Sequence, residues 1–420
     1  MPPFHHPNLR DHAEPSFAVS DTGVTLSETQ LHRDDSRPAH FVAAPAGISF
    51  RDPEALSPSA GVLPRSLDAF PQDYFQSRSR FLDLLRLAGG RSESHEIAAR
   101  GPQGQPLHID IGIFGPENPK RVLLHIAGMH GIEGFVGSAI QSEVLRAKPL
   151  VGGDAGFVLV HCLNPWGMAH LRRANEDNID LNRNFLPAGG QWEGTPEGYR
   201  LLNGILNPSR REELSAWFYP SAIGSILRHG FTPLKQAVLD GQFDQPAGIM
   251  FGGHGRAESS RFIDAWLRRT LGSVERVLGI DVHAGLGSFA RQTLFIEHRR
   301  SNPRVAEIER ALEMRLTTLP EGAGPYVPTA RGAACDALPA LFPDARVDWL
   351  LQEFGTYSAL RVLRALREEN FFYHHGTAQE RQSYATHFRE MFTPQSFQWR
   401  ESVLRTGVNL VARAAQNLLA

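Results

Sequence analysis

The chain is poor in cysteine. Its 420 residues contain only two, Cys162 and Cys335, and neither stands in a C-x-x-C pair. The sequence therefore implies no disulfide framework and no cysteine-based zinc site. We expect two buried free thiols, and the alternative is a single bridge between them.

An excess of charge is also missing. The 43 basic and 45 acidic residues leave a formal net charge of −2, which gives no support to a nucleic-acid or polyanion surface. No apolar run approaches the roughly 20 residues of a membrane span, and the first residues lack the basic and apolar regions of a secretory signal. We therefore expect a soluble, cytoplasmic protein without nucleic-acid or membrane partners. Its oligomeric state is not indicated.

Sustained periodicity is absent from the first part of the chain. Residues 1–68 are rich in Pro, Ser, Asp, His and Arg, which predicts an irregular N-terminal extension. The length of the chain and its 41% hydrophobic content allow one large domain or two smaller ones, and we expect residues 69–420 to form one domain. This domain is predicted to begin with a helix near Pro71 that ends before Gly89.

Apolar runs and helical patterns then alternate, which is typical of an α/β domain with a mixed or parallel sheet between helical layers. The predicted strands are residues 107–114, 121–128, 156–163, 276–283 and 347–354. The predicted helices are residues 135–147, 259–271 and 359–370. Residues 190–255 break the alternation with many glycines and prolines, so we interpret them as an insertion at the rim.

Polar side chains follow these strands at the point where each strand ends. The strand 121–128 continues into GMHGIEGF, the strand 276–283 closes in DVHAGLG, and the strand 347–354 closes in QEFGTY. In open α/β sheets, ligands bind beyond the carboxyl ends of the strands. The sequence therefore predicts a functional site at this edge of the sheet.

One possible chemistry for that site is metal binding. His130 and Glu133 form an H-x-x-E pair just after a strand, and His283 at another strand end would supply a third ligand. Two histidines and one glutamate, with one position left open, form a catalytic zinc pattern found in carboxypeptidase A. Asp281 could orient a metal ligand by contacting it on the side away from the metal. The H-x-x-E pair alone is a weak signal, because such a pair also occurs beside ordinary helix starts. Other catalytic signatures, such as H-E-x-x-H and G-x-S-x-G, are absent.

A longer motif is more specific. Residues 164–185 read NPWGMAHLRRANEDNIDLNRNF, and they follow Gly-x-His-Gly-x-Glu at 128–133. Here the chain resembles the zinc carboxypeptidase (metallocarboxypeptidase) family, and in particular a largely uncharacterised bacterial branch of it. That family has N-P-x-G, an arginine, D-L-N-R-N-F, a ligand histidine and a catalytic glutamate in this order, over roughly residues 70–375 here. The resemblance implies a three-layer α/β/α fold with a mixed central sheet of about eight strands.

The resemblance also implies functional roles for individual residues. One zinc ion per chain would be held by the two histidines and the glutamate described above. Arg173 matches the family arginine that polarises the scissile carbonyl, with the adjacent Arg172 as the alternative. Asn182 and Arg183 match the pair that holds the terminal carboxylate of the substrate, and a guanidinium fork suits a carboxylate.

Glu353, 70 residues after His283, matches the general base of the family. Its proposed role is to take a proton from the zinc-bound water and to deliver it to the leaving amine. The alternative is a structural glutamate paired with an arginine at a strand end. A mobile active-site tyrosine is also usual in the family. Tyr326 is the candidate here, and Tyr357 is a weaker one.

The expected function is a zinc-dependent hydrolase that cleaves an amide bond next to a free carboxylate, as a metallocarboxypeptidase does on peptides or on a small peptide-like substrate. An alternative is an N-acyl amino acid deacylase or desuccinylase-like amidohydrolase, because related enzymes share the zinc ligands and the Asn–Arg pair. A third is a catalytically silent zinc-binding protein, against which Glu353 and Arg173 argue. The sequence does not indicate the natural substrate or the specificity pocket.

Overall fold

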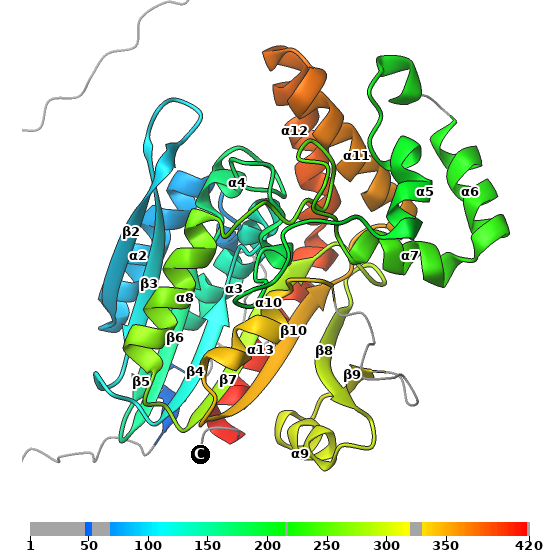
Figure 1. Cartoon of the computed structure of the whole chain (residues 1–420). Helices are drawn as coiled ribbons and strands as arrows, with labels where there is room; N and C mark the ends of the chain where they lie inside the picture. Colours follow the sequence, from blue (N-terminus) through cyan, green and yellow to red (C-terminus); the bar gives the residue numbers. More distant parts are fainter. Residues whose placement is uncertain (1–46, 53–67, 215–216, 320–329, 418–420) are drawn as a thin grey trace, which may run out of the picture. The chain divides into compact units, whose positions relative to one another are not determined.

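The computed structural model describes residues 47–52, 68–214, 217–319 and 330–417. Most of the predicted N-terminal extension lies outside these residues, so its extent stays a prediction. Within them an eight-stranded sheet has the order β2-β3-β6-β4-β7-β10-β8-β9 (Figure 1). The strands are β2 (Arg91–Arg100), β3 (Pro106–Phe114), β4 (Arg121–Ile126), β6 (Ala155–His161), β7 (Arg276–Ala284), β8 (Gln292–Arg299), β9 (Leu316–Leu319) and β10 (Arg346–Phe354).

The sheet is mixed, with parallel strands at its centre. Strands β6, β4, β7 and β10 pair in parallel, whereas β3 runs antiparallel to β6 and β8 runs antiparallel to β10. Because the central strands are buried on both faces, their sequences are almost continuously apolar. The carboxyl ends of β4, β7 and β10 therefore lie at one edge of the sheet.

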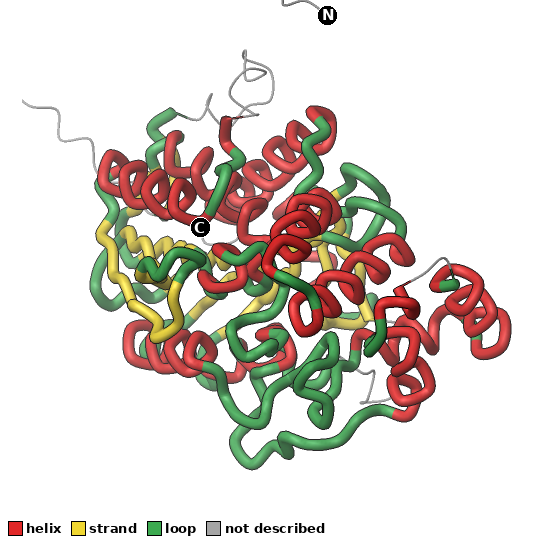
Figure 2. Tube along the Cα trace, turned by 90° about the horizontal axis from the view of Figure 1, so that it is seen from above, coloured by secondary structure: helices red, strands yellow, loops and turns green. Residues whose placement is uncertain are grey.

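Helices cover both faces of the sheet, so the predicted three-layer α/β/α architecture with about eight strands is confirmed (Figure 2). The apolar side chains of the helices join two core clusters. One cluster includes side chains of α2 (Tyr74–Ala88), α3 (Gly134–Arg146), α9 (Pro303–Leu312) and α13 (Phe397–Asn417). The other includes side chains of α8 (Glu258–Leu271), α11 (Ala359–His375) and α12 (Ala378–Phe392).

The predicted first helix corresponds to α2. The carboxylate of Asp73 caps its first turn by accepting a hydrogen bond from the Gln76 amide, and Gly89 ends it in the left-handed conformation at φ 83°. A small two-stranded sheet pairs β1 (Ile48–Phe50) with β5 (Pro149–Val151). Both cysteines are free thiols, as expected, although only Cys162 is fully buried.

The predicted insertion is largely helical. It contains α5 (Glu197–Leu206), α6 (Phe218–His229) and α7 (Phe231–Leu239), which lie beside α11 (Figure 1). Two side chains of α11 fasten this segment: Arg367 donates to the Ile205 carbonyl at 2.7 Å, and Asn370 donates to the Ala247 carbonyl at 2.7 Å. Among the described residues, no helix has both the length and the apolar composition needed to cross a membrane.

Candidate active site

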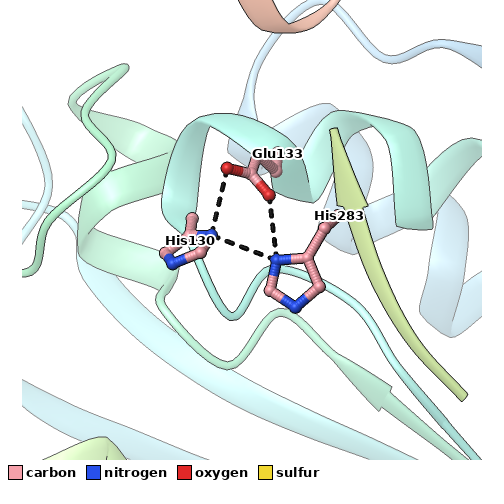
Figure 3. Close-up of side chains that lie close together, drawn as sticks. All are labelled: His130, Glu133 and His283. Carbon is pink, nitrogen blue, oxygen red and sulfur yellow. Dashed lines mark hydrogen bonds and ion pairs between the residues drawn. The ribbon is translucent and has the colours of Figure 1, made fainter. Parts of the chain in front are cut away.

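The side chains of His130, Glu133 and His283 converge at the carboxyl ends of β4 and β7 (Figure 3). The Nδ1 atoms of the two histidines are 3.2 Å apart. Glu133 Oε1 lies 3.0 Å from His130 Nδ1, and Glu133 Oε2 lies 3.2 Å from His283 Nδ1. All three side chains are buried. They form a group that could hold a metal ion.

The spacing within this group suits a small divalent ion. Two nitrogens bound tetrahedrally at about 2.1 Å from one zinc ion lie about 3.4 Å apart, close to the observed separation of the two Nδ1 atoms. The two Nδ1 atoms face each other, so one ion between them could contact both (Figure 3). Two imidazoles and one carboxylate are also a donor set that zinc prefers. The residues present therefore fit the metal that the sequence motifs imply.

A close backbone contact holds the H-x-x-E segment in place. A Cβ atom added to Gly131 would lie 2.1 Å from the carbonyl carbon of Gly167, so only glycine fits at this position. The Gly131 amide also donates to the Arg173 carbonyl at 3.1 Å, and the Asn164 side chain donates to the same carbonyl at 3.2 Å. The H-G-I-E, N-P-W-G and arginine segments are therefore packed together as one unit.

Besides contacting Glu133, each histidine lies close to an aspartate carboxylate through its Nε2 atom. Asp281 Oδ2 lies 3.0 Å from Nε2 of His283, as the sequence predicted, and Asp180 Oδ1 lies 3.0 Å from Nε2 of His130. A carboxylate in this position can accept a hydrogen bond from a protonated Nε2, which leaves Nδ1 free to bind a metal. Burial alone would raise the pKa of Asp180, but Arg173 and His130 outweigh it and hold the pKa well below its usual range.

Asp180 is a site residue that sequence reasoning missed. It is the first residue of D-L-N-R-N-F, which drew attention only for its Asn-Arg pair. Besides facing His130, it accepts a hydrogen bond from the Asn182 amide at 3.0 Å and one from Arg173 Nε at 3.2 Å. The signal available was an acid at the start of a turn, a position where carboxylates commonly cap backbone amides.

Of the two adjacent arginines, Arg173 faces the three candidate ligands. Its Nη1 donates to Glu133 Oε1 at 2.6 Å, and its Nη2 lies 2.7 Å from Nε2 of His130. Arg172 points elsewhere: its guanidinium pairs with Glu369 and stacks 3.4 Å from the centre of the Tyr373 ring. The geometry thus places Arg173, and not Arg172, within reach of a ligand bound at the group.

Glu353 ends β10 beside His283 and is 7% exposed. Its Oε1 accepts a hydrogen bond from the Leu286 amide at 2.8 Å. Burial and the nearby Glu133 carboxylate raise the pKa of Glu353 to about 7. The pKa of Glu133 itself is lowered, because His130 and Arg173 outweigh the effect of its burial. Two neighbouring carboxyl groups therefore have opposite tendencies: Glu133 stays ionised, whereas Glu353 can exchange a proton near neutral pH.

Asn182 and Arg183 lie in the short 3-10 helix Leu181–Arg183. Asn182 Oδ1 accepts from the Ala334 amide at 3.0 Å, and Arg183 Nη1 donates to the Asn182 carbonyl at 2.8 Å. Among the described residues, Nε of Arg183 has no hydrogen-bond partner although it is buried. Burial lowers the pKa of Arg183, with Asp180 acting against it. A buried guanidinium with an unused donor is suited to binding an anion.

One cavity of about 370 Å³ connects all these groups. It is lined by the three candidate ligands and by Arg173, Asn182, Arg183 and Glu353. Its remaining walls are mainly aliphatic, and many come from α5, α6, α7 and α11. Sequence reasoning did not find this wall, because the helices of the insertion were not recognised.

Of the two candidate tyrosines, only Tyr357 is among the described residues. Tyr326 lies outside the described residues, so its assignment stays a prediction. The Tyr357 hydroxyl donates a hydrogen bond to Glu390 Oε1 at 2.8 Å. Tyr357 is not among the described residues that line the cavity.

The motifs and the fold can be set beside known proteins. A family model described as "Protein of unknown function (DUF2817)" matches residues 70–406. The chain belongs to this family. No curated protein matches the sequence of this DUF2817 member.

Several solved structures resemble the DUF2817 chain at low identity. Murein-tripeptide amidase MpaA from Escherichia coli O157 is 18% identical, with 67% of this chain and 91% of that chain covered and a TM-score of 0.34. A metallocarboxypeptidase from Pseudomonas aeruginosa is 16% identical, with 81% and 69% covered and a TM-score of 0.36. Another from Burkholderia cenocepacia is 12% identical, with 83% and 69% covered and a TM-score of 0.38.

Proposed function

We propose that the protein is a zinc-dependent hydrolase that cleaves an amide bond next to a free carboxylate. One observation carries the proposal: a single cavity joins the His130, Glu133 and His283 group to the buried guanidinium of Arg183. The first can hold a zinc ion, and the second has an unused donor for an anion. A substrate that reaches both has a cleavable bond near its carboxylate end.

Zinc would be held by His130, Glu133 and His283. When bound, it supplies Lewis acidity toward a carbonyl oxygen and toward water. Asp180 and Asp281 keep the two imidazoles oriented with Nδ1 toward the ion.

Glu353 acts as the general base. Its carboxylate accepts a proton from the attacking water and later delivers it to the leaving nitrogen. Burial raises the pKa of this carboxyl group, so it takes up a proton more readily than an exposed glutamate does. The Leu286 amide holds the carboxylate in place through Oε1.

Arg173 donates hydrogen bonds to the scissile carbonyl oxygen as negative charge develops on it. Its guanidinium donates to Glu133 and lines the same cavity, so it lies beside the place that a bound carbonyl would occupy. Asn182 and Arg183 hold the substrate carboxylate on the leaving side. The leaving product is therefore an amino acid with a free carboxylate.

Two kinds of substrate satisfy these roles. A peptide would make the protein a carboxypeptidase, and an N-acyl amino acid would make it a deacylase. The aliphatic cavity wall favours the second, because it offers a peptide backbone few hydrogen-bond partners. In both cases Glu353 and Arg173 argue for catalysis, since zinc binding alone needs neither a base nor a carbonyl-polarising arginine.

A matched pair of substrates tests the proposal. An N-acyl amino acid and its carboxamide differ only at the group that Arg183 would bind. We expect about one zinc ion per chain in the purified protein. We expect hydrolysis of the free acid to stop on chelation and to return with zinc, and the carboxamide to react at least about 30-fold more slowly, which corresponds to about 2 kcal/mol.

The variant Arg183→Gln supplies the control. It should keep its zinc but lose most of the preference for the acid over the carboxamide. Equal rates for the two substrates with the natural protein, or a protein that neither holds zinc nor gains activity from it, would contradict the proposal.

A further inference from the structure

The cavity continues away from the candidate ligands into a chamber with aliphatic walls. Helices of the insertion form one side, and α11 forms the other. The wall residues on which the argument depends are Leu202, Leu206, Ala222, Ile226, Leu363 and Leu366. We call this part of the cavity the aliphatic chamber.

The chamber is a fixed part of the fold and not a gap between loosely placed helices. Leu206 is 1% exposed, so α5 is firmly packed at its carboxyl end. The bonds from Arg367 to the Ile205 carbonyl and from Asn370 to the Ala247 carbonyl join the insertion to α11. Within the insertion, the Tyr199 hydroxyl donates to the Ile249 carbonyl at 2.6 Å, which joins α5 to the segment after α7.

The opposite end of the insertion touches the anion-binding arginine. Gly241 follows α7, and a Cβ atom added to it would lie 2.8 Å from Cδ of Arg183. The insertion therefore contacts Arg183 at one end, beyond α7, and contacts α11 through the Ile205 carbonyl of α5 at the other. Arg183, Glu353 and the aliphatic chamber all line the same cavity, so a ligand with its carboxylate on Arg183 can extend into the chamber without leaving the cavity.

The chamber offers little to polar ligands. Its polar lining residues from the insertion are Ser225, Lys235 and Gln236, and Gln236 already donates to Asp240 at 2.6 Å. A peptide bound there would bury amide and carbonyl groups without partners, at a cost of about 1–3 kcal/mol for each group. A hydrocarbon chain has no such groups to satisfy and gains from every methylene that leaves water.

We propose that the substrate is an N-acyl amino acid whose acyl group is an aliphatic chain held in the chamber. The bond-breaking part rests on the proposed function. The oxygen of water bonds to the acyl carbon, the C–N bond breaks, and the amine nitrogen takes up a proton. The products are an aliphatic carboxylate and a free amino acid.

Binding to the zinc-loaded Glu353→Gln protein tests the chamber without requiring turnover. The probes are N-acetylglycine, N-hexanoylglycine and N-decanoylglycine, measured by calorimetry. We expect the affinity to rise about fourfold for each methylene that the chamber buries, since each contributes about 0.8 kcal/mol. The natural protein should show the same order in kcat/KM. Equal affinity for the acetyl and decanoyl probes would overturn the inference.

Variants of α6 provide a matched pair. Ala222→Phe fills the chamber and should lower the ratio of decanoyl to acetyl affinity by at least about tenfold. Ile223→Phe changes the adjacent residue, which is 48% exposed on the outer side of α6, and should leave that ratio unchanged. If Ala222→Phe does not fold, Leu363→Asn on α11 makes the chamber wall polar and should lower the same ratio. Unchanged ratios in the folded variants would also overturn the inference.

The two proposals can fail separately. If no amide is hydrolysed but the affinity still rises with chain length, the chamber stands and the hydrolase does not. If short N-acyl amino acids are hydrolysed and chain length has no effect, the hydrolase stands and the chamber does not.

Discussion

His283 and Glu353 are register partners on the neighbouring parallel strands β7 and β10. Parallel neighbours lie about 4.8 Å apart, and residues in register point to the same face of a sheet. The distance between a candidate metal ligand and the candidate base is therefore set by the sheet itself and not by a loop. A site built on paired strands is held more rigidly than one built on mobile connections.

The first prediction concerns Glu353. Replacing it with glutamine keeps its size but removes the group that accepts a proton. We expect kcat to fall by about 10²- to 10⁴-fold, in keeping with the usual contribution of a positioned base. Zinc content measured on the same sample should be unchanged, which separates loss of the base from loss of the metal. Turnover close to that of the natural protein would remove Glu353 from the mechanism.

A second prediction separates the adjacent arginines by matched alanine variants. Arg173→Ala should lower kcat/KM by about 10²- to 10³-fold, because it removes donors aimed at the scissile carbonyl. Arg172→Ala should instead lower the free energy of unfolding by about 3 kcal/mol, since it leaves the Glu369 carboxylate, whose side chain is only 11% exposed, without this partner. Kinetics and denaturant unfolding of both variants check this. The reverse pattern would show that the roles are exchanged.

A third prediction concerns the close approach of Gly131 to Gly167. Gly131→Ala places a methyl group 2.1 Å from backbone atoms, so the H-G-I-E turn must shift. We expect a loss of at least about 3 kcal/mol in unfolding free energy, together with weaker zinc binding. Gly204→Ala is the control: it lies within α5 with nothing within 4 Å of the added atom, and it should stabilise the protein by about 0.5–1 kcal/mol.

A fourth prediction concerns pH. Glu297 lies in a cluster with Cys335 and Asp336, and burial together with the Asp336 carboxyl raises its pKa to about 8. The folded state therefore holds this proton more tightly than the unfolded state does. The contribution of this proton to the free energy of unfolding is complete below about pH 4.5 and is lost as the pH rises toward 8.

The variant Glu297→Gln tests this sign because it cannot titrate. The free energy of unfolding of the variant minus that of the natural protein should be larger at pH 8 than at pH 5. Denaturant unfolding with zinc present at both pH values measures this difference. A stability difference that is independent of pH would show that Glu297 does not hold a proton in the folded state.

The sequence predicted the middle of the sheet better than its edges. Strands such as β4 and β7 are buried on both faces, so their residues form continuous apolar runs. The edge strand β2 reads RSESHEIAAR, and Ile97 is its one buried residue. Its structure comes from pairing with β3, which no local pattern reveals.

The site could be predicted where its residues fall in an ordered motif, and not where they meet only in the fold. His130, Glu133 and His283 were candidates because their types and order indicate a metal. Asp180 was passed over because its contact with His130 joins residues 50 positions apart. The aliphatic wall was missed for a similar reason: α5 turns its apolar side toward a cavity, in a segment whose glycines and prolines suggested loops.

Asp180 connects three parts of the site with one carboxylate. It faces His130 and Arg173, and through the Asn182 amide it shapes the turn that carries Arg183. A metal ion bound to His130 and an anion bound to Arg183 would therefore both affect the Asp180 carboxylate. Their binding equilibria must be reciprocal: whichever ligand binds first changes the affinity for the other by an equal factor. If zinc binding changes the affinity for an inhibitor with a carboxylate, that inhibitor must change the affinity for zinc by the same factor.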